Sequence, residues 1–208
     1  PPSMDYGFKD LKDPNAYNVD RAKQLLAEDG WKDTDGDGIL DKDGKPLTFD
    51  FVVYNSRAEL PLYAEAVQAD LKKVGIDMKI KTVDYNLIDK MGQDGDYDML
   101  ISNIVTANTG DPIWFLANYW HTNVDGSNPQ NGSGYSNPQV DQLLDAAETE
   151  FDPAKRRAYA IQIQQLLMND GAALFLGYPK TNIVTGSYLK GAVMYPSDYY
   201  WITNKITK

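Results

Sequence analysis

Helical and strand patterns alternate along the first half of the chain, and this alternation constrains the fold more than any other feature. The last strand pattern, YDMLISNIV, is a nearly continuous apolar run, which predicts a central strand covered on both faces. Alternation of this kind predicts an α/β fold in which helices flank a sheet. The expected elements are a helix at 19–29, a strand at 47–54, a helix at 57–74, a strand at 76–83, a short helix at 85–91 and a strand at 97–105.

The second half begins with a long polar stretch, residues 106–136, that is rich in Asn, Gly, Ser, Thr and Pro. Loops of this length inside a compact domain are usually functional or disordered. The tail from Ser187 is aromatic and has no clear periodicity. The expected elements are an aromatic helix at 112–120, a helix from 137 to about 151, a helix at 153–168, and strands at 172–177 and 181–185.

The residue inventory excludes several kinds of site. The 208 residues include no Cys and one His, His121, which excludes disulfides, thiolate metal sites, cysteine nucleophiles and sites that need two imidazoles. A net charge of −10 argues against a broad nucleic-acid surface, and no apolar run approaches the 18 residues of a membrane span. No P-loop, Rossmann glycine motif or nucleophile–His–acid arrangement is present, so we do not expect an enzyme.

Five segments carry distinctive motifs: PPSM at 1–4, YNVDRAKQLLAEDGW at 17–31, DTDGDGILDKDGKPL at 33–47, GDPIWFL at 110–116 and GYSNPQVDQLL at 134–144. In order and spacing they resemble motifs of the family 5 extracellular solute-binding proteins. These are the peptide- and nickel-binding components of ABC importers. Two positions depart from the usual motif, with Arg for Lys at 21 and Asp for Ala at 29.

The resemblance implies that the chain is one lobe of a larger protein, because intact members are more than twice as long. It implies a periplasmic-binding-protein type II lobe, with a mixed sheet flanked by helices. Residues 1–186 would form the C-terminal, substrate-binding lobe. Residues 187–208 would form a tail that crosses back to the N-terminal lobe, which would explain the many Tyr and Trp residues there.

The same resemblance implies solute capture for an ABC importer outside the cytoplasm. The expected partners are a small-molecule or peptide ligand, the N-terminal lobe of the same protein and the ABC permease subunits, and no nucleic acid. The membrane would be reached only through a lipid anchor at the N-terminus of the intact protein. The ligand remains open among a di- or oligopeptide, a nickel chelate and a sugar.

An acidic loop follows the first helix and matches much of an EF-hand calcium loop. Calcium prefers hard oxygen ligands, and a DxDxDG turn aims carboxylates inward. Position 12 of the pattern is Gly44 rather than Glu, and Asp43 is a candidate substitute. The loop is therefore either a structural calcium site or a solvated acidic turn. The candidate ligands are Asp33, Asp35, Asp37, Asp41 and Asp43.

This loop supports the alternative function, a calcium-stabilised extracellular structural or adhesion module. Solute capture requires no cofactor, so calcium would serve only as a structural ion. The two functions differ in whether calcium or a transported solute is the main ligand.

The candidate ligand-binding residues lie on either side of the GDP motif. In peptide-binding relatives an Asp four residues before the Pro pairs with the peptide's α-ammonium group, and Asn108 occupies that position here. Asn lacks the charge of a carboxylate, which favours a blocked, neutral or metal-chelate ligand. Asn103 and Asn108 are expected to face the cleft, although both could instead cap turns.

Three further candidates end the aromatic helix. Tyr119 and Trp120 are expected on the ligand side, because an isolated lobe exposes the face that closes on its partner. His121 is a candidate contact for a nickel chelate, since Ni²⁺ favours nitrogen ligands. The alternative for His121 is a helix-end residue beside the aromatic core.

Overall fold

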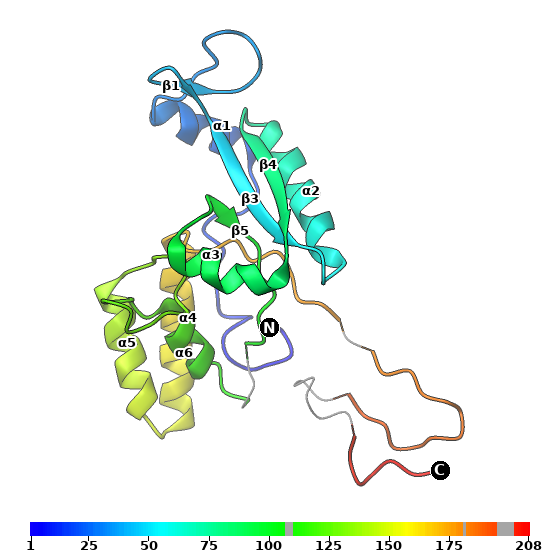
Figure 1. The fold of residues 1–208 in the computed structure, drawn as a ribbon. Coiled ribbons are helices and arrows are strands. Elements are labelled where there is room, and N and C mark those ends of the chain that lie inside the picture. Colours follow the sequence, from blue (N-terminus) through cyan, green and yellow to red (C-terminus); the bar gives the residue numbers. More distant parts are fainter. Residues whose placement is uncertain (107–109, 181, 195–201) are drawn as a thin grey trace. The chain divides into compact units, whose positions relative to one another are not determined.

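The computed structural model describes residues 1–106, 110–180, 182–194 and 202–208 (Figure 1). The chain divides into two compact units, each built from separate stretches of sequence. The sheet unit contains Pro14–Asn103 and Asn123–Tyr135, and the helical unit contains Pro1–Asp13, Ile104–Thr122 and Ser136–Lys208. In the part of the chain that is described, no helix is long and apolar enough to cross a membrane.

The sheet unit alternates helices and strands as the sequence predicts, and it confirms the α/β fold class. Asn18 begins the first helix, because its side chain accepts a hydrogen bond from the backbone amide of Arg21. The elements are α1 Val19–Glu28, β1 Asp41–Lys42, β2 Lys45–Pro46, β3 Thr48–Tyr54, α2 Glu59–Lys72, β4 Asp77–Val83, the 3₁₀ turn η1 Tyr85–Leu87, α3 Ile88–Asp94 and β5 Met99–Leu100.

The three-stranded sheet has the order β4-β3-β5, and its strands are all parallel. The expectation of a mixed sheet is therefore wrong for the described strands. Helix α2 carries the chain from β3 to β4, and η1 with α3 carries it from β4 to β5, so each strand restarts at the same end. The antiparallel β1–β2 pair is a separate hairpin.

The central strand is β3 rather than the predicted strand at 97–105. Residues 51–54 of β3 are all buried, and β4 and β5 pair with β3 on either side. Only Met99 and Leu100 of the apolar run form a strand, and both are half-buried. The run is apolar because it borders the sheet's core, but its register against β3 lasts for two residues only.

The described residues of the helical unit form three helices, each of which confirms a predicted one. Asn137 and Asp152 cap α5 and α6 with side-chain oxygens that accept backbone amides, and Pro follows both caps. Each helix buries a stripe of apolar residues at helical spacing, which includes Leu116, Leu144 and Ile163. The helices are α4 Ile113–Trp120, α5 Pro138–Thr149 and α6 Pro153–Asn169.

Residues 5–12 lie along α6 in the same unit. Arg157 donates to the carboxylates of Asp5 and Asp10, and further along α6 Gln165 exchanges two hydrogen bonds with the backbone of Lys12. Gly7 lies between these contacts with φ +105°, and a Cβ atom there would come within 2.5 Å of the side chain of Ile161. The segment therefore fits α6 only with glycine at this position.

The strands predicted after α6 are not formed at 172–177 or in the described part of 181–185. Residue 181 lies outside the described residues. A strand needs a neighbour to accept its backbone hydrogen bonds. The described tail supplies one such pairing, the isolated bridge between Lys190 and Thr207.

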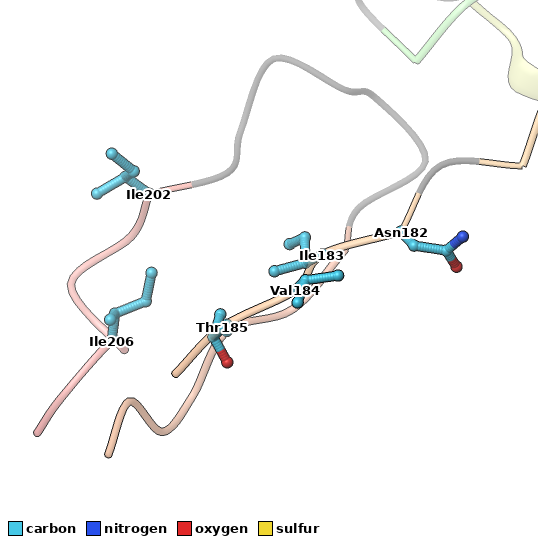
Figure 2. Close-up of a pocket in the computed structure, with 7 residues that line it drawn as sticks. Asn182, Ile183, Val184, Thr185, Ile202 and Ile206 are labelled. Carbon is cyan, nitrogen blue, oxygen red and sulfur yellow. The ribbon is translucent and has the colours of Figure 1, made fainter. Parts of the chain in front are cut away.

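Several apolar side chains in the segment after α6 are exposed to solvent. Figure 2 shows a shallow hollow between two lengths of tail, lined mainly by aliphatic side chains. Val184 and Ile202 beside it are 93% and 91% exposed. Such exposure is unusual for large aliphatic side chains in a folded domain. Phe175 and Leu174, closer to α6, are also exposed.

Candidate ligand-binding site

The carboxyl ends of the sheet's strands provide the polar edge on which a ligand site can form. Parallel strands present their carboxyl ends at one edge. From β3 the chain passes to β4 on one side, and it later returns to β5 on the other side of β3. The ends of β3 and β5 therefore form a topological switch point, where ligands bind in open α/β sheets.

Asn103 lies at this switch point. Its backbone amide donates to the hydroxyl oxygen of Tyr54, the last residue of β3, at 3.1 Å. The Tyr54 ring in turn packs edge to face on Tyr85, which follows β4, with ring centroids 5.1 Å apart. Residues at or just after the carboxyl ends of all three strands thus meet at this edge. The cleft-facing position expected for Asn103 stays a prediction, and its place at the carboxyl edge supports it.

Glu59 lies at the same edge, and no motif in the sequence identifies this residue as a candidate. It occupies the first turn of α2, and its Oε1 atom lies 3.5 Å from the side-chain nitrogen of Asn103. Both side chains are half-buried. The helix that follows a parallel strand begins at the carboxyl edge, and this rule could have identified the first residues of α2 as candidates.

Asn108 lies outside the described residues, so its role stays a prediction. The structure does describe the neighbouring Asp111 of the GDP motif. Its Oδ1 atom accepts a hydrogen bond from the backbone amide of Ile113, the first residue of α4, at 2.8 Å. Its Oδ2 atom accepts two hydrogen bonds from the Arg156 guanidinium, at 2.9 and 2.6 Å. Arg156 also donates to the backbone oxygens of Ala147 and Glu150. The GDP motif therefore joins the start of α4 to the end of α5 and to α6.

The structure corrects the expectation that Trp120 is exposed on the ligand side. Trp120 is 8% exposed and belongs to the buried stripe of α4. The spacing of Ile113, Leu116 and Trp120 at i, i+3 and i+7 places all three against the other helices of the unit. Tyr119 lies on the other face, half-buried, with its ring 5.2 Å from that of Phe115. Its contact with a ligand stays a prediction.

His121 lies beside two acidic residues of α5. Its Nε2 atom is 3.3 Å from the Asp145 carboxylate, and its Nδ1 atom is 3.7 Å from that of Asp141. Burial by itself lowers the pKa of His121, but the Thr122 carbonyl and the two carboxylates outweigh burial and raise the pKa above 6.5. Asp141 also accepts the backbone amide and the hydroxyl of Thr122, at 2.9 and 2.6 Å. These contacts fit the alternative of a helix-end residue, and the nickel-chelate contact stays a prediction.

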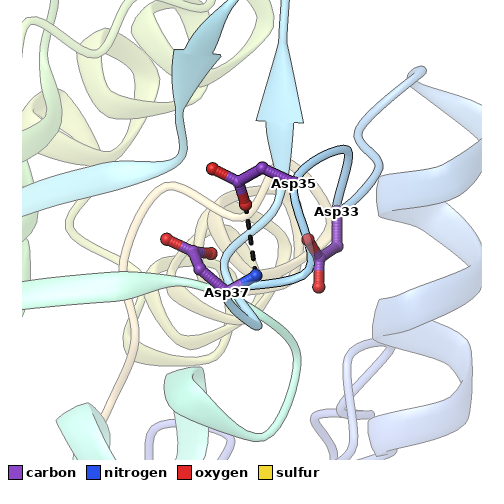
Figure 3. Close-up of side chains that lie close together, drawn as sticks. All are labelled: Asp33, Asp35 and Asp37. Atoms are coloured by element: carbon purple, nitrogen blue, oxygen red, sulfur yellow. Dashed lines mark hydrogen bonds between the residues drawn. The ribbon is translucent and has the colours of Figure 1, made fainter.

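Three carboxylates of the acidic loop converge, as Figure 3 shows. Oxygens of Asp33, Asp35 and Asp37 lie within 4.8 Å of one another, and all three residues are exposed. The loop also bonds to itself, because the Asp33 carboxylate accepts the backbone amides of residues 36 and 38. Within the described residues Asp41 and Asp43 are not part of this group.

The other two acidic residues of the loop, Asp41 and Asp43, have local structural roles. The Asp41 carboxylate accepts the backbone amide and the hydroxyl of Thr34, at 3.2 and 3.0 Å. Asp43 has a positive φ, as does Gly44, so this pair forms the tight turn of the β1–β2 hairpin. The proposed substitution of Asp43 for a twelfth-position ligand is therefore not supported by its place in the turn.

Comparison with known proteins gives consistent matches along the chain. Residues 1–127 match the family model described as bacterial extracellular solute-binding proteins, family 5 Middle. The oligopeptide-binding protein AppA of Bacillus subtilis is 32% identical over 196 residues, which are 90% of this chain and 34% of AppA. This chain thus spans about a third of the length of that relative.

Solved structures agree in fold. The chain is similar to Bacillus subtilis AppA in complex with a nonapeptide, with a TM-score of 0.82 and 30% identity over 99% of this chain and 40% of AppA. It is also similar to Staphylococcus aureus NikA in complex with Ni(L-His)2, with a TM-score of 0.64 and 27% identity over 78% of this chain and 32% of NikA. The chain belongs to the bacterial extracellular solute-binding proteins of family 5.

Proposed function

We propose that this chain supplies the C-terminal half of a solute-binding site in an ABC importer's binding protein. The observation that carries the proposal is the position of Asn103 at the switch point, where three strand ends meet. This edge joins residues far apart in sequence into one polar surface, as a binding site in an open α/β sheet requires. The match to relatives that bind a nonapeptide or a nickel–histidine complex supports the same function.

The proposed solute is a peptide or a nickel chelate, because the relatives named above bind these two classes. The chain is proposed to bind and release its solute without chemical conversion. A second lobe, supplied by the rest of a longer protein, would complete the site and close over the solute by a hinge motion. The relatives' greater length supports this arrangement.

The tail from Ser187 is proposed to pack against that second lobe, with residues 1–186 as the C-terminal lobe itself. Exposed aliphatic side chains, such as Val184 just before the tail and Ile202 within it, support a partner surface for the tail. The intact protein is proposed to act outside the cytoplasm, held by an N-terminal lipid anchor, and to deliver its solute to the ABC permease subunits. Extracellular location is the general property of the family.

Isothermal titration of the full-length protein that contains this chain tests the proposal. The probes are a degenerate nonapeptide pool and Ni(L-His)2, each titrated separately. We expect saturable binding of one of the two. The Asn103→Ala variant should weaken that binding by about tenfold, which corresponds to the loss of one ligand hydrogen bond at about 1.4 kcal/mol. Absence of binding to both probes would contradict the proposed function.

A further inference from the structure

The Glu59 carboxylate has unused bonding capacity at the carboxyl edge of the sheet. It has two oxygens and accepts roughly four hydrogen bonds when ionised. Among the described residues its one donor is the Asn103 side-chain amide, at 3.5 Å, which is longer than the usual range of about 2.7–3.2 Å and makes a weak hydrogen bond. Glu59 is half-buried, so a bound donor group can replace the water at its remaining acceptor positions. A bound donor group would supply the missing bonds.

The charges around Glu59 leave a negative group without a cation. Within the sheet unit, the segments that follow β3, β4 and β5, up to the first turn of the next helix, hold five charged side chains, namely Arg57, Glu59, Asp84, Asp89 and Lys90. Lys90 pairs with Asp94 on its own helix, so it does not neutralise Glu59. Asp84 is already satisfied locally, since its carboxylate accepts the backbone and side-chain amides of Asn86 at 2.8 Å. Arg57 is exposed and forms no ion pair with Glu59 in the described structure. The edge therefore favours a positively charged group at Glu59.

Asn103 adds an acceptor beside Glu59. Its side-chain nitrogen points to the carboxylate, so its carbonyl oxygen remains available to a second donor. The backbone bond to Tyr54 fixes the position of Asn103, and Tyr54 is itself 1% exposed. Two neighbouring acceptors, one of them charged, match an ammonium group, which has three donors and no acceptor.

We propose that Glu59, with Asn103 beside it, binds an ammonium group of the solute and so determines the preference for a positively charged ligand. This inference rests on the proposed solute-binding function. The ammonium group is either the α-amino group of a peptide or a lysine side chain, and both have the same bonding requirements.

Glu59 also has a second role that a test must separate. An acidic side chain in the first turn stabilises a helix, and α2 has Ala58 at its N-cap with no side-chain cap bond. The Glu59→Gln variant keeps the size and one acceptor oxygen and removes the charge. Glu65 lies on the same helix, is exposed, and its side chain forms no hydrogen bond or ion pair with the described residues. Glu65→Gln is therefore the matched control.

The experiment measures binding of three nonapeptide pools to the full-length protein by titration calorimetry. The first pool has free N-termini and no Lys or Arg, the second is the same pool N-acetylated, and the third is N-acetylated and contains Lys. The wild type should bind the first or the third pool about tenfold or more tightly than the second. Glu59→Gln should weaken that pool by about 10- to 100-fold and leave the second unchanged. Glu65→Gln should leave all three unchanged.

Two kinds of failure are distinguishable. If the wild type binds none of the pools and no Ni(L-His)2, the proposed function fails. If the wild type binds Ni(L-His)2 but none of the pools, or binds the pools equally, the assignment of Glu59 is overturned while the proposed function stands. The same holds if Glu59→Gln retains the wild-type preference. Thermal melting of each variant separates lost binding from lost folding, because an unstable variant loses affinity for all pools together.

Discussion

The ion pair between Asp111 and Arg156 gives the most detailed prediction. We expect Arg156→Met to destabilise the helical unit, because this one guanidinium connects three helices. It donates twice to Asp111 and once each to the backbone oxygens of Ala147 and Glu150. Methionine has similar length and can pack in the same space, so the change removes the charge and the donors without opening a large cavity.

The magnitude follows from burial and bonding. Hydrogen bonds to charged groups contribute about 1.5–3 kcal/mol each when well formed, and breaking a fully buried ion pair costs about 3–5 kcal/mol. Here the two side chains are 21% and 29% exposed, so water replaces part of the lost interaction. We therefore expect a loss of about 2–3 kcal/mol. Asp111→Asn removes the charge but can keep the acceptor for the Ile113 amide, and should cost about 1–2 kcal/mol.

Urea denaturation followed by circular dichroism measures these losses, with hydrogen exchange of α6 to locate them in the helical unit. The double variant Arg156→Met/Asp111→Asn should be less destabilised than the sum of the two single variants, since both remove the same pair. Lys155→Met is the control: the Lys155 side chain is 66% exposed, so its ion pair with Glu150 should contribute less than about 0.5 kcal/mol. A cost below about 0.5 kcal/mol for Arg156→Met, or strictly additive effects, would refute this reasoning.

Three further predictions concern other parts of the chain. His121 is the single His, so NMR can follow the titration of its imidazole without overlap, and the midpoint should lie above pH 6.5. Asp145→Asn should lower this midpoint, and an unchanged midpoint in the variant would contradict the ion pair. Because folding raises this pKa, the stabilisation by His121 is present below pH 6.5 and is lost as pH rises through the folded-state value. If the acidic loop binds calcium, Ca²⁺ should raise the melting temperature, EDTA should reverse this rise, and Asp35→Asn should abolish it. An unchanged melting temperature would mean that the loop is a turn held only by its own hydrogen bonds. Gly7→Ala should lower the free energy of unfolding, measured by denaturant, by about 1–3 kcal/mol, because φ is positive there and the new Cβ atom would meet Ile161. A variant as stable as the wild type would show that the segment does not pack as described.

Local patterns in the sequence predicted the helices well, and the reason is visible at their ends. Asn18, Asn137 and Asp152 each cap a helix with their own side chain, so the signal and the structure lie within three residues of each other. The run at 97–105 misled because apolar composition reports burial, whereas strand length depends on pairing with β3.

The candidate site was predicted only in part, for a similar reason. Asn103 could be selected because it lies in the segment before the GDP motif, where the family resemblance places ligand contacts. Glu59 could not, because its contact with Asn103 joins positions 44 residues apart and depends on the order of strands in the sheet. Trp120 is buried rather than exposed as expected, because its neighbours on α4 are also aromatic and only the packing of the helix decides which aromatic face is buried.

The division of the chain into interleaved units has a consequence for how the protein folds. The chain passes between the units at residues 13/14, 103/104, 122/123 and 135/136, so neither unit is one continuous piece. The contact between Lys12 and Gln165 closes a loop of 153 residues. During synthesis most of the sheet unit can therefore form first, while residues 5–12 must wait for α6 to emerge. The earliest part of this sequence to be made is among the last to reach its native contacts.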